Sequence, residues 1–285
     1  MKLSVIIPCY NAEATLGHQL EALSKQQWSH PWEVVIADNG STDRSLEVAE
    51  SYRGRFPGLR VLSAKERQGA AFARNTAIKA AVGEFLALCD ADDEVGEGWV
   101  AAMGEALTLH EFVGCRIDTV KLNPRWMRGH QQENGLQSIW YPPWLPHAGA
   151  GTMGFRREVF DKVGGFDENL LSLEDTDFSF QAQLKGYALH FAPDAVLHVR
   201  RRGNLLDHYR QSRNYAEYNV ILARKYWPEN ESAFRYYKGF MVDWLRLIRS
   251  VTSLRTHGGR FSWAWKLGRQ SGRLKGMLRR GGVPV

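Results

Sequence analysis

The chain has 285 residues, of which 44% are hydrophobic and 24% are charged, a balance that excludes a protein disordered throughout its length. Its net charge of +6 is unevenly distributed, because residues 235–285 hold twelve Lys or Arg and one acid, Asp243, whereas residues 1–234 carry −5. No run of 18 apolar residues occurs and the apolar run at the N-terminus is short, so we expect neither a transmembrane helix nor a signal peptide.

Short β-branched runs alternate with longer amphipathic stretches over the first 90 residues. The runs predict strands over 3–7, 33–37, 59–62 and 85–89. The stretches between them predict helices over 12–26, 42–52 and 69–82. This alternation is typical of βαβ units, so we predict an α/β fold with a mostly parallel, Rossmann-like sheet covered on both faces.

The pattern is more mixed beyond residue 96. It predicts a helix over 97–109, an extended segment over 112–122 and, in the Pro-, Trp- and Gly-rich stretch 124–151, an irregular loop. Ser172 is a candidate N-cap for a helix over 173–185, and residues 187–199 read as strands that end at His198. From about residue 207 the pattern is helical, with breaks at Pro228 and at Gly258-Gly259.

Polar side chains gather where the predicted strands end. Asp90-Ala91-Asp92-Asp93 places three carboxylates directly after a buried strand, and ligands of parallel sheets bind beyond the carboxyl ends of the strands. Clustered carboxylates repel one another, and their oxygens suit Mg²⁺ or Mn²⁺. The alternative is an acidic loop at the start of the following helix, where acids are favourable.

Several motifs in the same order resemble family 2 glycosyltransferases: Ser4 to Asn11, Asp38 to Asp43, Ala73-Arg74-Asn75, Asp90 to Asp93, Gly164 to Glu168, Glu174 to Asp177, and His198. The likeness covers about residues 1–225. It implies an inverting enzyme with a GT-A-type single domain that uses a nucleotide-diphosphate sugar, with a nucleotide half over about 1–110 and an acceptor half over about 111–225. A basic, amphipathic helical extension over 226–285 follows.

The resemblance also implies roles for individual residues. The donor, most simply a UDP-sugar, would be bound by Pro8, Tyr10, Asp38, Asn39, Arg67, Arg74 and Asp90. The divalent metal, Mn²⁺ or Mg²⁺, would be held by Asp92 and His198, with Asp90 or Asp93 touching ribose, sugar or metal. Arg74 could instead be structural, and His198 could be an ordinary strand histidine bound by the backbone. Many relatives have an Asp where this chain has Asn39.

The Glu-Asp pair of the family falls on Glu174 and Asp175, which implies that Asp175 is the general base. An inverting transfer needs one carboxylate to take the proton of the acceptor hydroxyl. Glu174, which would contact the acceptor, and Asp177 are the competing acids. All three could instead be acids that favour a helix start.

Two further segments are candidates for substrate contacts. Arg202, within the run Arg200 to Arg202, could neutralise the diphosphate, or the run could be a solvated loop. If the run contacts the diphosphate, we expect the segment after His198 to become ordered when nucleotide binds. Trp140 and Trp144, with Trp126 and Tyr141 close by, could form an aromatic wall for the acceptor, or could serve only to pack the loop.

The tail contains two basic, Trp-rich stretches with apolar residues at steps of three or four. The first runs from Phe234 to Leu254 and the second from Phe261 to Leu278. This pattern fits an anionic membrane surface and equally fits packing on the protein itself or oligomerisation. No nucleic-acid-binding motif accompanies the charge, so we expect no nucleic acid partner.

Taken together, the sequence predicts a metal-dependent inverting glycosyltransferase with a glycan or lipid-linked acceptor. Cys9, Cys89 and Cys115 form no CxxC pair, which argues against a disulfide scaffold and a cysteine-based zinc site. The cysteine usage favours a cytoplasmic location, with peripheral attachment at the inner face of the membrane as an option. The alternatives are a non-catalytic nucleotide-sugar or glycan-binding protein on the same fold and a membrane-surface scaffold. A nucleotidyltransferase is disfavoured because no Gly-rich loop follows the first strand.

Overall fold

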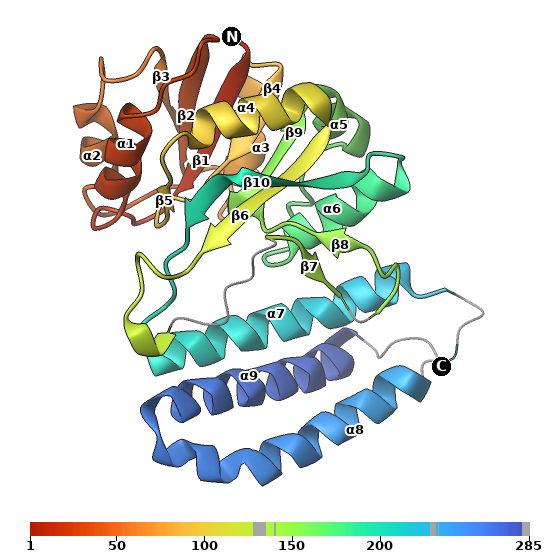
Figure 1. Cartoon of the computed structure of the whole chain (residues 1–285). Coiled ribbons are helices and arrows are strands. Elements are labelled where there is room, and N and C mark those ends of the chain that lie inside the picture. Colours follow the sequence, from red (N-terminus) through yellow and green to blue (C-terminus); the bar gives the residue numbers. More distant parts are fainter. Residues whose placement is uncertain (128–134, 140, 229–231, 233, 281–285) are drawn as a thin grey trace. The chain divides into compact units, whose positions relative to one another are not determined.

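The computed structural model describes residues 1–127, 135–139, 141–228, 232 and 234–280, which divide into two compact units (Figure 1). The first unit comprises Met1–Asn123, His130–Ser138 and Pro146–Arg200. The second comprises Pro124–Gly129, Ile139–Leu145 and Arg201–Val285. Helix α7 (Leu205–Tyr226), which the predicted boundary at 225 assigns to the first domain, belongs to the second unit.

The first unit contains a curled, eight-stranded sheet in the order β3-β2-β1-β4-β9-β6-β10-β5 (Figure 1). Its strands are β1 (Leu3–Cys9), β2 (Trp32–Asp38), β3 (Leu59–Ser63), β4 (Phe85–Leu88), β5 (Glu94–Val95), β6 (Phe112–Asp118), β9 (Met153–Arg156) and β10 (Leu189–His198). Strands β1 to β4 are parallel, as are β6 and β10. The predicted α/β fold with a mostly parallel sheet is therefore confirmed.

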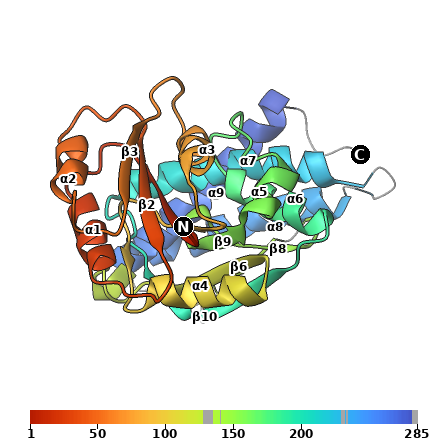
Figure 2. The same ribbon diagram turned by 90° about the horizontal axis from the view of Figure 1, so that it is seen from above.

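Helices cover both faces of this sheet (Figures 1 and 2). One face is covered by α1 (Leu16–Ser24), α2 (Ser45–Ser51) and α4 (Trp99–Leu109), and the other by α3 (Ala70–Ala80), α5 (Arg157–Val163) and α6 (Glu174–Leu184). The alternation of β1 explains the two layers, since Val5 and Ile7 join the first apolar cluster and Ile6 joins the second. Because both faces are buried, β1 and β2 read as nearly continuous apolar runs.

Strand β9 lies inside the sheet and is antiparallel to both β4 and β6. The sequence prediction missed it, because four residues after a Pro- and Gly-rich stretch carry no clear period-2 signal. Two short strands, β7 (Gln137–Ser138) and β8 (Pro146–His147), form a second sheet, and the 3-10 turn η2 (Ala150–Thr152) leads into β9. The prediction of an irregular loop up to residue 151 is wrong for these elements.

The N-cap predicted for α6 is also wrong. Leu173 occupies that position with a left-handed φ of 61°, and no side-chain cap bond is present. The helix itself is present at nearly the predicted bounds, because the acids Glu174, Asp175 and Asp177 fill its first turn and complement the helix dipole.

The second unit is helical, as predicted for the C-terminal extension. It contains α7, α8 (Phe234–Arg249), α9 (His257–Arg280) and the 3-10 segments η1 (Arg125–Met127) and η3 (Ser250–Arg255). The break between α8 and α9 falls within η3 and precedes Gly258-Gly259, which lie in the first turn of α9. No helix in the part of the chain that the structure describes has both the length and the apolarity to cross a bilayer.

A row of glycines on α9 allows its backbone to approach α7 closely. A Cβ at Gly268 would stand 2.5 Å from the Tyr209 carbonyl oxygen, and one at Gly276 would stand 2.9 Å from Cβ of Val220. At Gly272 the added atom would overlap the carbonyl oxygen of Arg213. The four-residue spacing places all three glycines on one side of α9, so the seam between the two helices tolerates no side chain there.

We therefore expect Gly272→Ala to lower the free energy of unfolding of the helical unit by about 1–3 kcal/mol, because the Arg213 backbone must shift to admit the methyl group. Gly239→Ala on α8 is the matched control, since nothing lies within 4 Å of its added Cβ. That substitution should be neutral or stabilising by about 0.5–1 kcal/mol. Chemical denaturation followed by circular dichroism compares the two variants. Equal effects would contradict a closed seam.

Candidate active site

The loops that follow β1 and β2 are joined to each other. The backbone N–H of Asn11 donates to Ser41 Oγ at 3.0 Å, and the Thr42 N–H donates to Asn11 Oδ1 at 2.8 Å. Asn11 has a left-handed φ of 48°, which asparagine tolerates better than most residues. This junction presents Tyr10, 55% exposed, at the carboxyl end of β1, next to the half-buried Pro8.

Asp38 and Asn39 differ in what their side chains do. The carboxylate of Asp38 accepts the N–H groups of Gly40 and Ser41, which is the usual geometry of a turn-forming aspartate. Asn39 is buried, its Nδ2 donates to the Arg67 carbonyl at 2.8 Å, and its Oδ1 accepts the Gly69 N–H at 2.8 Å. The Asn39 side chain therefore holds the loop that leads into α3.

Arg74 on α3 is buried between two carboxylates. Its Nη1 donates to Glu174 Oε1 at 2.6 Å and its Nη2 donates to Asp90 Oδ1 at 2.8 Å. Burial alone would lower the pKa of Arg74, but Asp90 and Glu174 raise that pKa above its ordinary value. Burial raises the pKa of Glu174, and the neighbouring guanidinium opposes that rise. Arg74 Nε is buried with no hydrogen-bond partner among the described residues.

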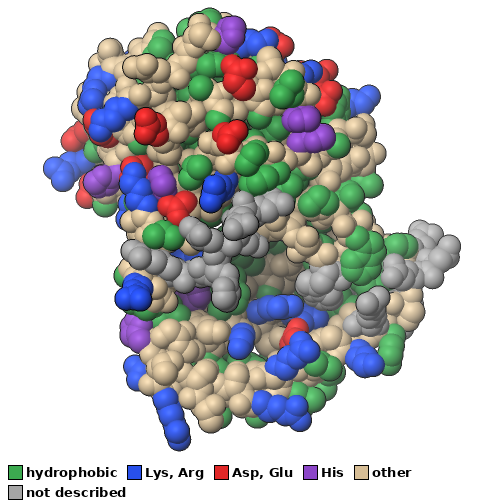
Figure 3. All heavy atoms as spheres, viewed as in Figure 1, with side chains coloured by type: hydrophobic (Ala, Val, Ile, Leu, Met, Phe, Trp, Pro, Cys, Tyr) green, Lys and Arg blue, Asp and Glu red, His purple; other side chains and the backbone are tan. Residues whose placement is uncertain are grey.

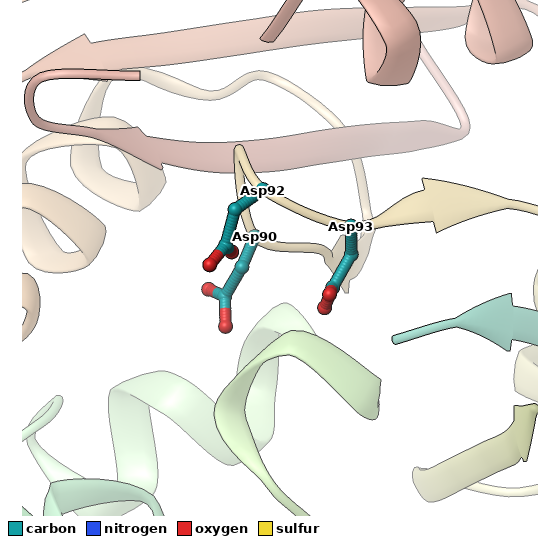
Figure 4. A group of neighbouring side chains, drawn as sticks. All are labelled: Asp90, Asp92 and Asp93. Carbon is teal, nitrogen blue, oxygen red and sulfur yellow. The ribbon is translucent and has the colours of Figure 1, made fainter. Parts of the chain in front are cut away.

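Asp90, Asp92 and Asp93 bring one carboxylate oxygen each within 4.8 Å of the others (Figure 4). Burial first, and then the charges of Asp90 and Asp92, raise the pKa of Asp93 to about 8. The Arg200 N–H donates to Asp93 Oδ1 at 2.9 Å. Three hard oxygen donors with an excess of negative charge fit a divalent cation such as Mg²⁺ or Mn²⁺.

His198 ends β10 and pairs with Glu94 of the short strand β5. Glu94 directly follows Asp93 in the chain. Its Nδ1 lies 2.5 Å from Asp118 Oδ2, and this contact fixes the orientation of the ring. Among the described residues, the group of close-lying metal-ligand atoms consists of Asp90, Asp92 and Asp93 and does not include His198.

The three acids at the start of α6 have different surroundings. Glu174 is bound to Arg74, and the buried Asp177 accepts a hydrogen bond from Gln181 at 2.7 Å. Asp175 is half-buried, its Oδ2 accepts the Ala150 N–H at 2.9 Å, and its Oδ1 accepts the Thr176 N–H at 2.7 Å. Asp175 is thus the most accessible of the three acids and is held by backbone donors.

The segment Gly149–Thr152 touches both Asp175 and the aspartate cluster, and no sequence motif marks it. A Cβ at Gly151 would stand only 2.8 Å from Asp90 Oδ2, so the glycine leaves room for that carboxylate. Gln19 was missed as well: it is buried, donates to the Asp90 carbonyl at 3.2 Å and accepts the Val95 N–H at 2.9 Å. The only sequence signal for Gly149–Thr152 is its run of small residues. Gln19 has no recognisable sequence signal.

The other candidate residues differ in their surroundings. Arg67 is half-exposed and pairs with Glu168 at 3.4 Å in the first unit. Arg202 and Trp144 are exposed residues of the second unit, and Trp140 lies outside the described residues. Of their aromatic neighbours, Tyr141 is buried with its hydroxyl on Asn219 at 2.6 Å, and Trp126 packs on His257 and Phe261, both in the second unit. Those two aromatics pack the helical unit.

Comparisons with known proteins identify the family of the chain. Residues 4–164 match Glycosyl transferase family 2, and residues 118–270 match Glycosyl transferase family group 2. The first match covers more than half of the chain, so the chain belongs to glycosyl transferase family 2.

The curated relatives that the chain matches are named as glycosyltransferases. The chain is 27% identical over 200 residues to the glycosyltransferase AglE of Haloferax volcanii. The aligned residues cover 68% of this chain and 65% of the relative. The chain is 45% identical over 94 residues to the uncharacterized glycosyltransferase YibD of Escherichia coli. That alignment covers 33% of this chain and 27% of the relative. The chain thus spans less than two thirds of the length of these relatives.

Solved structures share the GT-A fold. The mannosyltransferase PcManGT from Pyrobaculum calidifontis, in complex with GDP-Man and Mn²⁺, superposes with a TM-score of 0.68 and 18% identity over 98% of this chain and 88% of that one. Staphylococcus aureus TarS 1–349 in complex with UDP-GlcNAc gives 0.59 and 19% identity over 99% and 93% of the two chains. The predicted GT-A-type fold is therefore confirmed.

The position of Arg74 leads to a stability prediction. We expect Arg74→Met to lower the free energy of unfolding by about 3–5 kcal/mol, because two carboxylates would lose their buried partner. Arg67→Met is the matched control, and its half-exposed ion pair should cost about 1 kcal/mol or less. Guanidinium unfolding curves recorded with a chelator present give both values. A loss for Arg74→Met no larger than that of the control would contradict the central role of this ion pair.

Proposed function

We propose that the chain transfers a sugar from a nucleotide-diphosphate sugar, most simply a UDP-sugar, to a hydroxyl of a glycan or lipid-linked acceptor, with inversion at the anomeric carbon. The observation that carries the proposal is the segment Gly149–Thr152, which touches both the accessible carboxylate of Asp175 and Asp90 of the aspartate cluster. A base is thereby held beside the predicted donor-binding edge of the sheet. Family membership supports the reaction class.

The donor would lie across the carboxyl ends of the parallel strands. Pro8 and Tyr10 would contact the base and Asp38 the ribose, since all three sit at the edge where ligands of such sheets bind. Asn39 would act through the loop that it holds, because its side-chain polar atoms are engaged within the protein. The structures of TarS with UDP-GlcNAc and of PcManGT with GDP-Man and Mn²⁺ support a nucleotide-sugar donor.

A divalent metal would be held by Asp92, with Asp90 or Asp93 beside it. His198 is a candidate ligand through Nε2, since metal-binding histidines commonly have their other ring nitrogen on a carboxylate, as Nδ1 of His198 is on Asp118. When bound, the cation would offset the negative charge of the diphosphate leaving group. Arg67 and Arg74 would add positive charge at the same edge, although Arg74 already has two carboxylate partners.

The role of Asp175 is to take the proton of the acceptor hydroxyl as that oxygen attacks the anomeric carbon. Its carboxylate is held by the backbone N–H groups of Ala150 and Thr176, so no flexible side chain is needed to orient it. Positioned general bases of this kind contribute about 10²–10⁴-fold to the rate. Glu174, the predicted acceptor contact, would act indirectly by anchoring Arg74.

The three free, buried thiols support a cytoplasmic location.

Asp175→Asn should therefore reduce the turnover rate by about 10²–10⁴-fold and leave the dissociation constant of the donor nearly unchanged, because the amide cannot accept the proton and its single oxygen keeps only one of the two backbone N–H partners. Asp177→Asn is the matched control on the same helix turn. Donor hydrolysis or transfer is followed by nucleotide release, and donor binding by calorimetry. A larger rate loss in Asp177→Asn, or a parallel loss of donor binding in Asp175→Asn, would remove Asp175 from this role.

The donor and metal can be identified by thermal shift with UDP, GDP, dTDP and CDP, each with Mn²⁺, with Mg²⁺ or with a chelator. A ligand at about 100 times its dissociation constant adds about 2.7 kcal/mol of stability, which such a melt detects. We expect a metal-dependent shift with UDP that Asp92→Asn abolishes and that Asp161→Asn, on the exposed side of α5, retains. Failure of every nucleotide to shift the protein would refute the proposed function.

A further inference from the structure

Helix α8 carries a row of large apolar side chains that are exposed. Phe234, Met241, Leu245 and Ile248 are 70%, 61%, 54% and 65% exposed. Their spacing of seven, four and three residues places them on one face of the helix. Val251, 53% exposed at the start of η3, follows them. We call the four residues on α8 the apolar stripe.

The opposite face of α8 is packed within the second unit. Tyr236 and Leu247 are 2% and 3% exposed. The Arg273 guanidinium of α9 lies over the rings of Tyr236 and Phe240, at 5.1 and 5.0 Å, and Trp263 Nε1 donates to the Leu247 carbonyl at 3.3 Å. The apolar stripe therefore points away from α9, and packing against the described residues of its own unit does not account for it.

Charge is distributed unequally around the same helix. Asp243, the one acid of residues 235–285, lies toward α9, where it pairs with Arg273 at 3.2 Å and Arg269 at 3.5 Å. Lys238 and Arg249 are exposed beside the apolar stripe, whereas Arg246, 74% exposed, pairs with Asp243 at 3.3 Å. Figure 3 shows Lys and Arg side chains spread over the C-terminal helices, with few acids among them. The outer face of α8 thus combines apolar anchors with a cationic flank.

We propose that the outer face of α8 docks on an anionic lipid bilayer, with the apolar stripe in the headgroup–acyl boundary and Lys238 and Arg249 at the lipid phosphates. Helices that lie in a membrane interface have this combination of one apolar face and a basic polar face. Anionic lipids complement the acid-free flank. A second copy of the chain fits less well, because a symmetric contact through this face would bring the same cations of both copies together.

This inference goes beyond the proposed function and does not rest on it, since docking requires neither donor nor acceptor. The first test is flotation of the full chain with vesicles of phosphatidylcholine alone and of phosphatidylcholine mixed with phosphatidylglycerol. The wild type should float with the mixed vesicles only. Leu245→Glu/Ile248→Glu should weaken the partition coefficient by more than about tenfold, because charge replaces two inserted side chains. Leu109→Glu, at an exposed leucine of α4, is the matched control and should bind as the wild type.

The second test separates the cationic flank from the apolar stripe. Lys238→Gln/Arg249→Gln should weaken binding about fivefold for each cation removed, and added salt should have a similar effect. Lys25→Gln/Lys79→Gln, at exposed lysines of the first unit, is its control. Melting curves of every variant verify that it is folded.

The third test locates the inserted residues. The native cysteines are all buried, so Met241→Cys offers a single accessible thiol for a polarity-sensitive fluorophore. Its emission should shift to the blue with mixed vesicles, and the emission of a labelled Leu109→Cys should not. Equal binding to neutral and anionic vesicles, no binding to either, or a wild-type dimer that Leu245→Glu/Ile248→Glu converts to a monomer would each overturn the proposal.

Discussion

The buried guanidinium of Arg74 is the constraint on which the rest of the site depends. A cation removed from water must keep its counter-charges, so Asp90 at the end of β4 and Glu174 at the start of α6 are fixed to the same group. Arg74 in turn belongs to the helix whose entry loop is held by Asn39. Segments that are far apart in sequence are thus tied to one helix, the Asp90 and Glu174 segments by ion pairs with Arg74 and the entry loop by the hydrogen bonds of Asn39.

The same network gives the three aspartates different chemistry. Asp90 has a cationic partner in Arg74, whereas burial first, and then the charges of Asp90 and Asp92, raise the pKa of Asp93 to about 8. Asp92 is exposed and is the carboxylate least committed to burial. Because closely spaced carboxylates repel one another, a divalent cation would stabilise the arrangement by offsetting their negative charge. Uneven burial therefore singles out Asp92 as the principal proposed ligand among three adjacent aspartates.

The strands of the parallel half, the helices between them and the acidic strand ends were all predictable from the sequence. Buried parallel strands are continuous apolar runs, and their carboxyl ends meet at one edge, so the period alone places Tyr10, Asp38 and Asp90 together. Strand β9 and the segment Gly149–Thr152 were not predictable, because they act through backbone N–H groups and through the absence of a Cβ. Gln19 was likewise invisible, since its two hydrogen bonds span more than 70 residues and leave no local pattern.

The C-terminal helices show how similar patterns lead to different positions. Both tail stretches are basic, rich in aromatic residues and amphipathic, and the apolar period does not distinguish between them. Glycines do: Gly268, Gly272 and Gly276 give α9 a face without side chains, which fits closely against α7. Helix α8 has large apolar residues at comparable steps, and its Asp243 faces the Arg269 and Arg273 side chains of α9. Since α9 takes the packed position, one face of α8 covers α9. The other face carries the apolar stripe, for which the described residues of the second unit offer no partner.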